Sequence, residues 1–563
     1  MKRTLAWILA GLMAVSMSAC NQETKQETTQ PGSAPVESTP TEAKTNEKQP
    51  FEGTIIQLSD ESITVDGEAI AYDESAAVYA AHDIIFYLEG QDFTYGEGTA
   101  DDEHSQEEAD KHTVVHITQP GDYQLSGTLS AGQIAIDLGE EAEEDPNAVV
   151  NLYLNGVDIT CTVAPGVIFY NVYECGESDE ETATKDVDTS AAGANVFIVD
   201  GTENTVNGSY VARIYKSVEL SEDGKTVVDS KKLHKYDAAF YSKQSMNING
   251  SDGILNINAE NEGLDSELHL TINGGIVDIN SGNDGINTNE DSVSVTTING
   301  GEVNIVVNGS TGEGDGIDSN GWLVINGGTV NASSCGFSGD AGIDSDMGIH
   351  VNGGTVLATG NMYDRLEEGG QIYAVLTFAE RQSGGQTYSL KNAAGQELFS
   401  VTPANDFMYL ILSSPDLAEG TYSLWLGEMQ LAHGGSGMMG GFGGGHMMGQ
   451  LPGNIQRPED FDGQQPPEGM ENAPMNPDKI GGFKPMEQLQ PNEDGSYTLP
   501  DGSTVSAEEF QQRMEEFREQ GGKGMGGQRP NGVPNNTAEL SVDFTIQNGA
   551  NFFSGIAIPS ETN

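Results

Sequence analysis

The phrase Ile-Asn-Gly-Gly recurs through the middle of the chain, and its spacing is the strongest constraint on the fold. Copies or close variants begin at positions 248, 272, 298, 325 and 351, so successive copies lie 24, 26, 27 and 26 residues apart. A period in the twenties is typical of solenoids, in which each repeat forms one coil of the backbone. The sequence therefore predicts a stack of similar coils over this region.

Each copy reads as three short strands joined by turns. Around position 272, Leu268, Leu270 and Ile272 alternate with polar residues, as in a half-buried β-strand. Asn and Gly then turn the chain, because both tolerate positive φ, and Val277 and Ile286 mark a second and a third strand. Leucine-rich repeats have a similar period, but their LxxLxL frame is absent. The pattern therefore predicts an all-β fold, a right-handed parallel β-helix with a C-terminal β cap and long disordered segments.

Composition divides the rest of the chain. Asp66–Gly67 predicts an early hairpin. Within the coils, the segments 176–194 and 209–236 read as surface loops. Ser506 with Glu509 indicates the start of a short helix late in the chain. We expect these parts: 1–20 signal peptide, 21–50 disordered tether, 51–112 N-terminal strands and acidic loop, 113–360 β-helix, 361–431 β cap, 432–537 Gly/Met/Pro-rich insertion with one short helix, and 538–563 strands returning to the cap.

The first twenty residues read as an export signal. A basic start precedes an apolar run that is too short to span a membrane as a stable helix. The "MSAC" that follows resembles a bacterial lipobox, although Met17 replaces the usual leucine, and in such signals the cysteine, here Cys20, becomes lipidated. An ordinary cleaved signal is the alternative. Because no later segment is apolar enough to span, we expect a lipid-anchored protein on the extracellular face of the bacterial cell membrane.

The charge of the chain is strongly acidic. Asp and Glu number 87 against 24 Lys and Arg, a formal charge of −63. Such a surface repels nucleic acid and anionic headgroups, which excludes nucleic-acid partners, and it attracts divalent cations and basic partners. Solubility of a secreted protein would explain the same excess.

Three cysteines remain after the signal: Cys161, Cys175 and Cys335. An odd number leaves at least one unpaired in an exported chain. A bridge between Cys161 and Cys175 is one alternative, and the spacing matches no zinc pattern.

Acidic and amide residues recur at the third strand of each repeat. The aligned segments read NEGLDS (261–266), NDGINT (283–288), GDGIDS (314–319) and DAGIDS (340–345). Their Leu or Ile is expected to point into the core, so the residue after it points outward. This gives a first column of Asp265, Asn287, Asp318 and Asp344, and a second column of Glu262, Asp284, Asp315 and, one place off, Asp340.

These columns predict a cation site. Carboxylates stacked ~4.8 Å apart repel by about 3–4 kcal/mol at an effective dielectric constant of ~20. Calcium removes that repulsion, because Ca²⁺ takes six to eight oxygen ligands from carboxylates, amides and carbonyls. Asn287 keeps an oxygen in the row while removing one charge. We therefore expect Ca²⁺ at the eight column residues; solvated acidic turns are the alternative.

Several phrases together resemble a known family. "FIVDGTENTV", "AAFYSKQSMNINGSDGILNI" and the GG-x-V and DGI-D units are similar to the bacterial carbohydrate-binding domain family with a pectate-lyase-like β-helix, over roughly residues 110–430 and the C-terminal strand. The resemblance implies binding of an extracellular polysaccharide, such as a plant cell-wall or acidic glycan, and bound calcium.

Two other functions stay open. A lyase of pectate-lyase type needs calcium and a basic residue to remove a proton, and between 240 and 360 Lys243 is the only Lys or Arg. We therefore expect no enzyme activity unless a basic residue lies beside the columns. A structural surface adhesin is the other alternative. The row of asparagines at 249, 273, 299, 326 and 352 is expected to form an amide ladder rather than a sugar site.

Overall fold

The computed structural model describes residues 51–176, 178–221, 223–436, 497–498, 504–505 and 540–559. The expected signal peptide, Cys20, the tether and the short helix expected after Ser506 lie outside the described residues. The described part is all-β, as predicted, and its helical elements are α1 (Gln106–Ala109) and the 3-10 helix η1 (Glu140–Glu144). Within those residues, no helix has the length and apolar character needed to cross a membrane.

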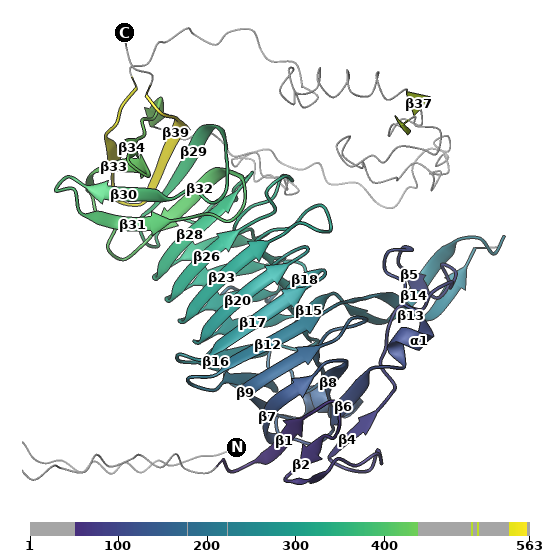
Figure 1. Cartoon of the computed structure of the whole chain (residues 1–563). Helices are drawn as coiled ribbons and strands as arrows, with labels where there is room; N and C mark the ends of the chain where they lie inside the picture. Colours follow the sequence, from purple (N-terminus) through teal and green to yellow (C-terminus); the bar gives the residue numbers. More distant parts are fainter. Residues whose placement is uncertain are drawn as a thin grey trace, which may run out of the picture. The chain divides into compact units, whose positions relative to one another are not determined.

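Two ladders of parallel strands run along a 21-stranded sheet (Figure 1). The register pairs Ile248 with Ile272, Ile272 with Ile298 and Ile298 with Ile325, so each Ile-Asn-Gly-Gly copy lies beside the next. The first ladder contains β11 (Ala194–Ile198), β16 (Met246–Gly250), β19 (His269–Ile272), β22 (Val295–Ile298), β25 (Trp322–Ile325) and β27 (Gly348–Val351). The second contains β12 (Glu203–Gly208), β17 (Ile254–Ala259), β20 (Ile276–Ser281), β23 (Glu302–Val307), β26 (Thr329–Ser333) and β28 (Thr355–Gly360).

The third strands of the repeats form a separate eight-stranded sheet. Seven of its strands are linked in parallel, and an antiparallel strand closes one end. In spatial order they are β24 (Ile317–Ser319), β21 (Ile286–Thr288), β18 (Glu262–Ser266), β15 (Ala238–Ser242), β10 (Val167–Asn171), β8 (Gly132–Asp137), β6 (Thr113–Ile117) and β4 (Val78–Ala81).

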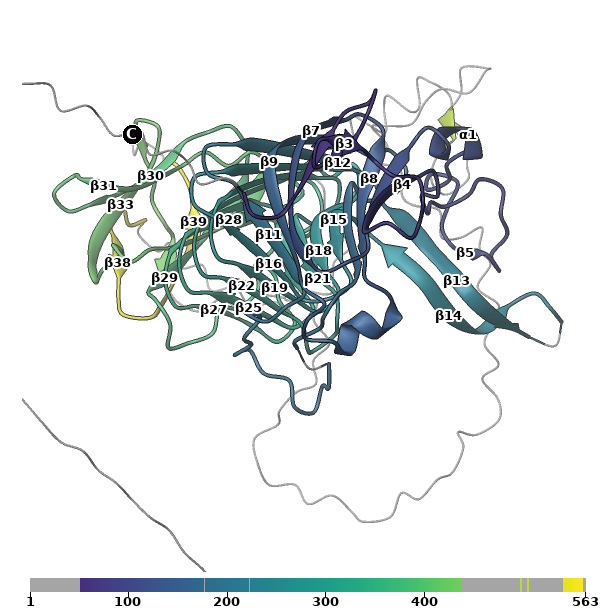
Figure 2. The same ribbon diagram turned by 90° about the horizontal axis from the view of Figure 1, so that it is seen from below.

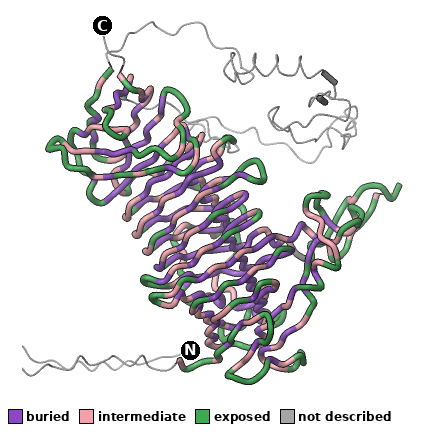
Figure 3. The backbone as a smooth tube through the Cα atoms, viewed as in Figure 1, coloured by how far each residue is buried: buried purple, intermediate pink, exposed green. Residues whose placement is uncertain are grey.

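The core lies between these ladders. Leu264, Ile286, Ile317 and Ile343 are all buried in one apolar cluster with residues of the other two ladders. Figure 3 shows the strands of the stack as mostly buried backbone joined by exposed turns. Each fully buried aliphatic side chain contributes about 1.5–3 kcal/mol, so the repeated apolar positions supply stability coil by coil.

The predicted asparagine ladder is confirmed. Asn273 donates to Asn249 at 3.0 Å, and the amides of Asn299, Asn326 and Asn352 each donate to the preceding Oδ1 at 2.9 Å. The row therefore fixes the register of the turns.

Short strands and a long hairpin precede and flank the stack. β2 (Thr64–Val65) and β3 (Glu68–Ala69) form the predicted hairpin, with Asp66 and Gly67 at positive φ. β1 (Thr54–Leu58), β7 (Gly121–Leu129) and β9 (Val150–Thr160) extend the large sheet in parallel. The prediction of a surface loop at 209–236 is wrong, because β13 (Val211–Leu220) and β14 (Val227–Tyr236) pair antiparallel there. β5 (Gly96–Glu97) pairs with the start of β13.

Antiparallel strands follow the stack. β29 (Tyr373–Gln382), β32 (Phe407–Ser413), β35 (Gly435–Ser436) and β39 (Ala550–Ile556) belong to the large sheet. A second sheet holds β30 (Tyr388–Asn392), β31 (Glu397–Val401), β33 (Gly420–Leu426), β34 (Met429–Gln430) and β38 (Phe544–Ile546). Strands from after position 540 thus pair with strands from before 430. β36 (Tyr497–Thr498) pairs with β37 (Thr504–Val505) alone, within the expected insertion.

The three described cysteines are unpaired. Cys161 and Cys335 are buried and Cys175 is half-buried, and no disulfide joins them. The alternative of a bridge between Cys161 and Cys175 is therefore wrong for this structure.

Candidate functional site

The first column forms as the alternation predicted. Register places Asp265 beside Asn287 and Asn287 beside Asp318, on β18, β21 and β24. A bridge between Ile317 and Ile343 continues the row, which brings Asp344 next in line after Asp318. Three strands of one sheet and the bridged segment beyond them thus contribute one oxygen-bearing side chain each to the same row.

The second column is linked through the backbone of the following repeat. The Asp315 N–H donates to Asp284 Oδ1 at 2.6 Å, and the Ala341 N–H donates to Asp315 Oδ1 at 2.5 Å. Asp340 accepts from the Gly314 N–H at 2.7 Å and from the Ser338 hydroxyl. These carboxylates therefore hold neighbouring turns together, and in each of Asp284 and Asp315 one of the two oxygens makes that bond.

The columns are covered at one end. Asp265 is 0% exposed, and Glu262, Asp284 and Asn287 are buried as well, whereas Asp318 and Asp344 are half-buried. The Asn289 amide donates to both oxygens of Asp265 at 3.0 Å. The alternative of freely solvated turns is therefore wrong at Glu262 and Asp265.

Burial raises the pKa of these carboxyl groups. It raises the pKa of Asp284 to about 7 and that of Asp318 to about 8, where the carboxylates of Asp284 and Asp344 add to the effect. The pKa values of Glu262, Asp265 and Asp315 are raised for the same reason, burial first and neighbouring carboxylates second. Without a cation, these buried carboxyl groups therefore favour their protonated, neutral form.

Two oxygen atoms in the covered end have no partner. Glu262 Oε2 and Asn287 Oδ1 are buried and accept no hydrogen bond. The other polar atoms of the two side chains meet, since Asn287 Nδ2 donates to Glu262 Oε1 at 3.2 Å. A buried acceptor without a donor costs roughly 1–3 kcal/mol, so the pair presents two oxygens that a cation would satisfy.

The eight predicted residues are brought to one face, but they do not surround one point. Within the described part of the chain, no three His, Cys, Asp or Glu side chains converge closely enough to hold a metal ion. The donor chemistry nevertheless suits a hard cation, because the column atoms are all carboxylate or amide oxygens and no thiolate or imidazole is among them.

Sequence reasoning missed the residues that flank the columns. Lys235 forms an ion pair with Asp237 at 2.7 Å and acts electrostatically on Glu262 and Asp265. Burial alone would lower the pKa of Lys235, but the carboxylates of Asp237, Glu262 and Asp265 together raise it by more, so the ammonium form is held. Asp364 lies beside the far end, and burial raises its pKa to about 6.

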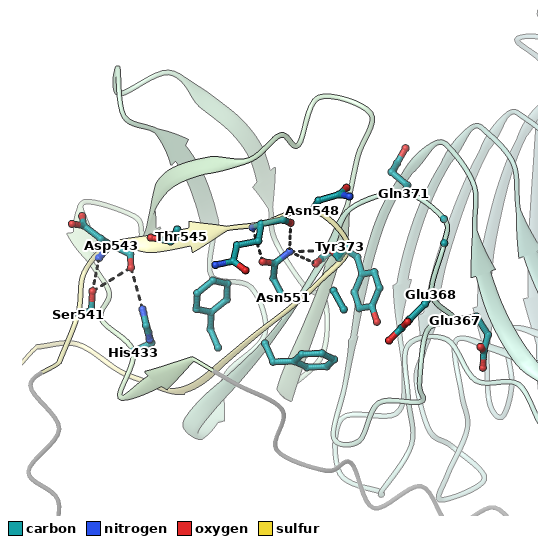
Figure 4. Close-up of a pocket in the computed structure, with 17 residues that line it drawn as sticks. Glu367, Glu368, Gln371, Tyr373, His433, Ser541, Asp543, Thr545, Asn548 and Asn551 are labelled. Carbon is teal, nitrogen blue, oxygen red and sulfur yellow. Dashed lines mark hydrogen bonds between the residues drawn. The ribbon is translucent and has the colours of Figure 1, made fainter. Parts of the chain in front are cut away.

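A large cavity lies elsewhere, among the strands that follow the stack (Figure 4). Its volume is about 930 Å³, and none of its lining residues belongs to the columns. The Asn551 amide, which lines it, already donates to the carbonyls of Tyr373, Gln547 and Gly549. Glu367, Glu368 and Asp543 also line the cavity, and the Asn551 amide is already bonded to the backbone.

Comparison with known proteins gives one family. The family described as carbohydrate-binding domain-containing protein matches residues 111–402. A relative with that description from Acetivibrio thermocellus is 31% identical over 162 residues, which are 29% of this chain and 43% of the relative. The chain thus spans less than half the length of that relative.

One solved structure is also similar in part. It is described as a polysaccharide lyase-like protein from C. thermocellum, in a gadolinium derivative, and the match covers 54% of this chain and 93% of that chain at 20% identity and a TM-score of 0.30. A likeness at this TM-score establishes neither the fold nor an activity of this chain.

Proposed function

Since the chain belongs to the family of carbohydrate-binding domain-containing proteins, whose match covers 292 of 563 residues, we propose that it binds polysaccharide with calcium held at the two acidic columns. Family membership supports carbohydrate binding, and the side chains of the columns would supply oxygen ligands for the calcium. The observation that supports bound calcium is the pair of buried oxygens without hydrogen-bond donors, Glu262 Oε2 and Asn287 Oδ1.

Calcium would use oxygens already gathered on this face. Glu262, Asp265 and Asn287 would hold it at the covered end, and Asp284, Asp315, Asp318, Asp340 and Asp344 further along. Amide and carbonyl oxygens and water count among the six to eight ligands of Ca²⁺, so such oxygens would complete the coordination that the column side chains begin. A bound Ca²⁺ would also accept hydroxyl or carboxylate oxygens of a sugar.

The fold behind this site is, we infer, a right-handed parallel β-helix. Three parallel ladders repeat every 24–27 residues and enclose one apolar cluster. A right-handed crossover is the strong preference for parallel strand connections. In such a fold the columns become a straight line of ligands along one face, which suits an extended polymer.

We also propose that the protein acts outside the cell, attached through lipid at Cys20. The basic start, short apolar run and "MSAC" of the first twenty residues support this placement. A polysaccharide ligand is consistent with it, because such polymers lie outside the membrane.

A glycan array probed with the full chain tests the function. With calcium present we expect binding to a subset of polysaccharides, and with EDTA we expect that binding to disappear. Binding that is equal in both buffers would leave the carbohydrate function and remove the role of calcium. An array with no signal in either buffer would overturn the proposed function.

A polysaccharide lyase is the second candidate, and Lys235 is the observation that favours it. The sequence window around the columns offered no Lys or Arg except Lys243, but the structure brings Lys235 within electrostatic reach of Glu262 and Asp265 from outside that window. Asp237 holds Lys235 in its ammonium form, which cannot accept a proton, so we favour binding without catalysis. Calcium bound at the columns would weaken the electrostatic stabilisation of the Lys235 ammonium form.

The lyase candidate has a direct test. We expect no rise in absorbance from unsaturated uronate when the protein is mixed with polygalacturonate and calcium. A steady rise that Lys235→Gln abolishes, while Lys243→Gln leaves it, would establish the lyase instead.

A further inference from the structure

The cavity of Figure 4 lies between two segments that are far apart in the sequence. Apart from His433, its lining residues come from 367–373, which connect the stack to β29, and from 541–553, which contain β38 and β39. β39 pairs with β29 and β38 with β33, among the strands that follow the stack (Figure 2). The volume of about 930 Å³ is near the upper end of the usual range for ligand sites, so a short oligosaccharide would fit.

One side of the cavity carries a row of polar side chains from β38 and its ends. Asp543, Thr545 and Gln547 alternate with Phe544 and Ile546, which are buried in the apolar core. Successive side chains of a strand point to opposite faces, so the three polar side chains share the face away from that core. All three are exposed, and their hydrogen bonds within the described residues use backbone atoms alone. This row therefore offers a carboxylate, a hydroxyl and an amide to a ligand.

Glu367 and Glu368 bring two more carboxylates from the segment after the stack. Figure 4 draws them at the end of the cavity opposite Asp543. Among the described residues, neither carboxylate takes part in a hydrogen bond or an ion pair. Hydrogen-bond acceptors thus stand at both ends of the cavity.

Apolar surface lies between these ends. Phe552 of β39 lines the cavity and is half-buried, and its ring meets the Tyr373 ring edge-on, with the centroids 6.3 Å apart. A pyranose ring has C–H groups on its faces and hydroxyl groups around its edge. One ring face can therefore pack on Phe552, while the hydroxyls donate to carboxylates and exchange hydrogen bonds with the amide and hydroxyl row.

Charge limits which sugar the cavity can take. Its lining residues include Glu367, Glu368 and Asp543 but no Lys or Arg. The carboxylate of a uronate would be repelled here, in contrast to columns that hold calcium. An uncharged sugar meets no such repulsion. An amino sugar would be attracted by charge, and the test below separates the two.

We propose that this cavity is a calcium-independent binding site for a neutral oligosaccharide. The proposal rests on the carbohydrate part of the proposed function and adds a site that does not use the columns. A short sugar held by exposed polar groups binds weakly, so we expect saturation at millimolar concentrations, an affinity too low to register on a glycan array.

Titration calorimetry of the full chain in EDTA tests the proposal. The probes are cellohexaose, xylohexaose and mannohexaose, with trigalacturonate as the acidic sugar and the glucosamine hexamer as the basic one. We expect at least one neutral probe to bind, with an affinity that added calcium does not change, and we expect neither charged probe to bind.

Variants at each end of the cavity locate the sugar. E367A/E368A should bind the neutral probe at least about tenfold more weakly, because hydrogen bonds to charged groups are lost, and E367Q/E368Q should stay within about threefold of wild type because it keeps an acceptor at each position. E380A/E397A removes the same charge from exposed positions outside the cavity and should bind like the wild type.

T545A/Q547A changes the opposite row and should weaken binding about fivefold or more. Thermal melting checks that each variant is folded. Because the two ends give independent variants, a folding defect in one leaves the other as the test.

Each other result contradicts the proposal in a recognisable way. If no neutral probe binds while the array still shows calcium-dependent binding, only this inference falls. If the glucosamine hexamer binds instead, E367Q/E368Q loses as much as E367A/E368A and salt weakens the binding, the cavity takes a cation and the proposal is wrong. If a neutral probe binds but the folded variants at both ends bind it like the wild type, the sugar lies elsewhere. If the wild type binds no sugar in either buffer, the proposed function fails and this inference with it.

Discussion

At the scale of single residues, the columns combine buried carboxyl groups with buried oxygen atoms that accept no hydrogen bond. Asp265 is buried and is held only by the Asn289 amide, while Glu262 and Asn287 each keep one oxygen without a donor. Buried carboxylates usually acquire a cation or a proton, because isolated charge in a low dielectric is costly. The columns are therefore a calcium site only if these residues bind a cation rather than a proton.

Calcium binding should depend on Asp318. Asp318→Asn keeps an oxygen but removes one charge in the middle of the column, so we expect calcium to bind about tenfold more weakly or worse, since charge count tunes these sites. Asp315→Asn with Asp318→Asn should abolish binding there. Titration calorimetry measures both, with the exposed Asp416→Asn in the cap as the control. Wild-type affinity in all three variants would mean that the columns hold no calcium.

Stability without calcium should fall as pH rises. The pKa is about 7 for Asp284 and about 8 for Asp318 in the folded chain, against roughly 3.9 in the unfolded chain. Between about pH 4 and pH 8 the folded state therefore binds more protons, so the free energy of unfolding decreases as pH rises through that window.

Thermal melts in EDTA at pH 5, 6.5 and 8 check this dependence. We expect the midpoint to fall toward pH 8, calcium to restore it, and Asp318→Asn to flatten the slope, because its side chain cannot ionise. A midpoint that instead rises with pH in EDTA would contradict the raised pKa values.

At the scale of elements, the repeat made most of the stack predictable. A fixed spacing of Ile-Asn-Gly-Gly specifies which strands pair, and the register of Ile272 with Ile298 and the ladder through Asn273 and Asn299 follow from it. The burial of Asp265 could not be predicted, because the contact of the Asn289 amide with its carboxylate depends on how neighbouring coils stack, which the repeated phrase does not specify. An alignment of AAFYS with EGLDS would have placed Tyr241 at the end of the first column.

The hairpin of β13 and β14 escaped prediction for a different physical reason. Strands are recognised by one buried face, and most residues of β14 are exposed, so 227–236 carries no clear alternation. Antiparallel pairing with β13, which no local pattern encodes, defines that strand. The return of the C-terminal strands to the cap was expected, and β39 pairs with β29 although the two lie more than 160 residues apart in the chain.

A glycine substitution tests how tightly the turns are stacked. Gly301 has φ +83, and a Cβ there would lie 2.5 Å from the Gly275 carbonyl oxygen, which belongs to the neighbouring backbone. Gly301→Ala should therefore lower the free energy of unfolding by at least about 1–3 kcal/mol. Gly339→Ala is the matched control, because a Cβ there meets nothing within 4 Å. Urea unfolding of both variants measures the difference, and equal stabilities would mean that the turns are not closely stacked.

At the scale of the whole molecule, charge and attachment belong to one question. A chain with a formal charge of −63 is repelled by an anionic membrane surface, so electrostatics would not keep it near the cell. A protein of this charge that works at the cell surface needs a covalent hold or an external polymer. Membership of the carbohydrate-binding family is consistent with such a polymer, and a lipid at Cys20, as proposed above, would be the covalent hold.

Cys20→Ala decides whether that hold exists. If Cys20 carries lipid, the variant should lose the mass of the acyl chains and should either appear in the medium or accumulate as unprocessed precursor, because two or more acyl chains are what keeps a soluble domain on a bilayer. Fractionation of cells with intact mass measurement distinguishes the two fates. Asp318→Asn in the same strain serves as the control, since it alters the columns and should leave fractionation unchanged. If Cys20→Ala stays with the membrane at wild-type mass, the signal is an ordinary cleaved one. Retention of the protein at the surface must then come from polysaccharide alone, and a wash with EDTA should release the protein.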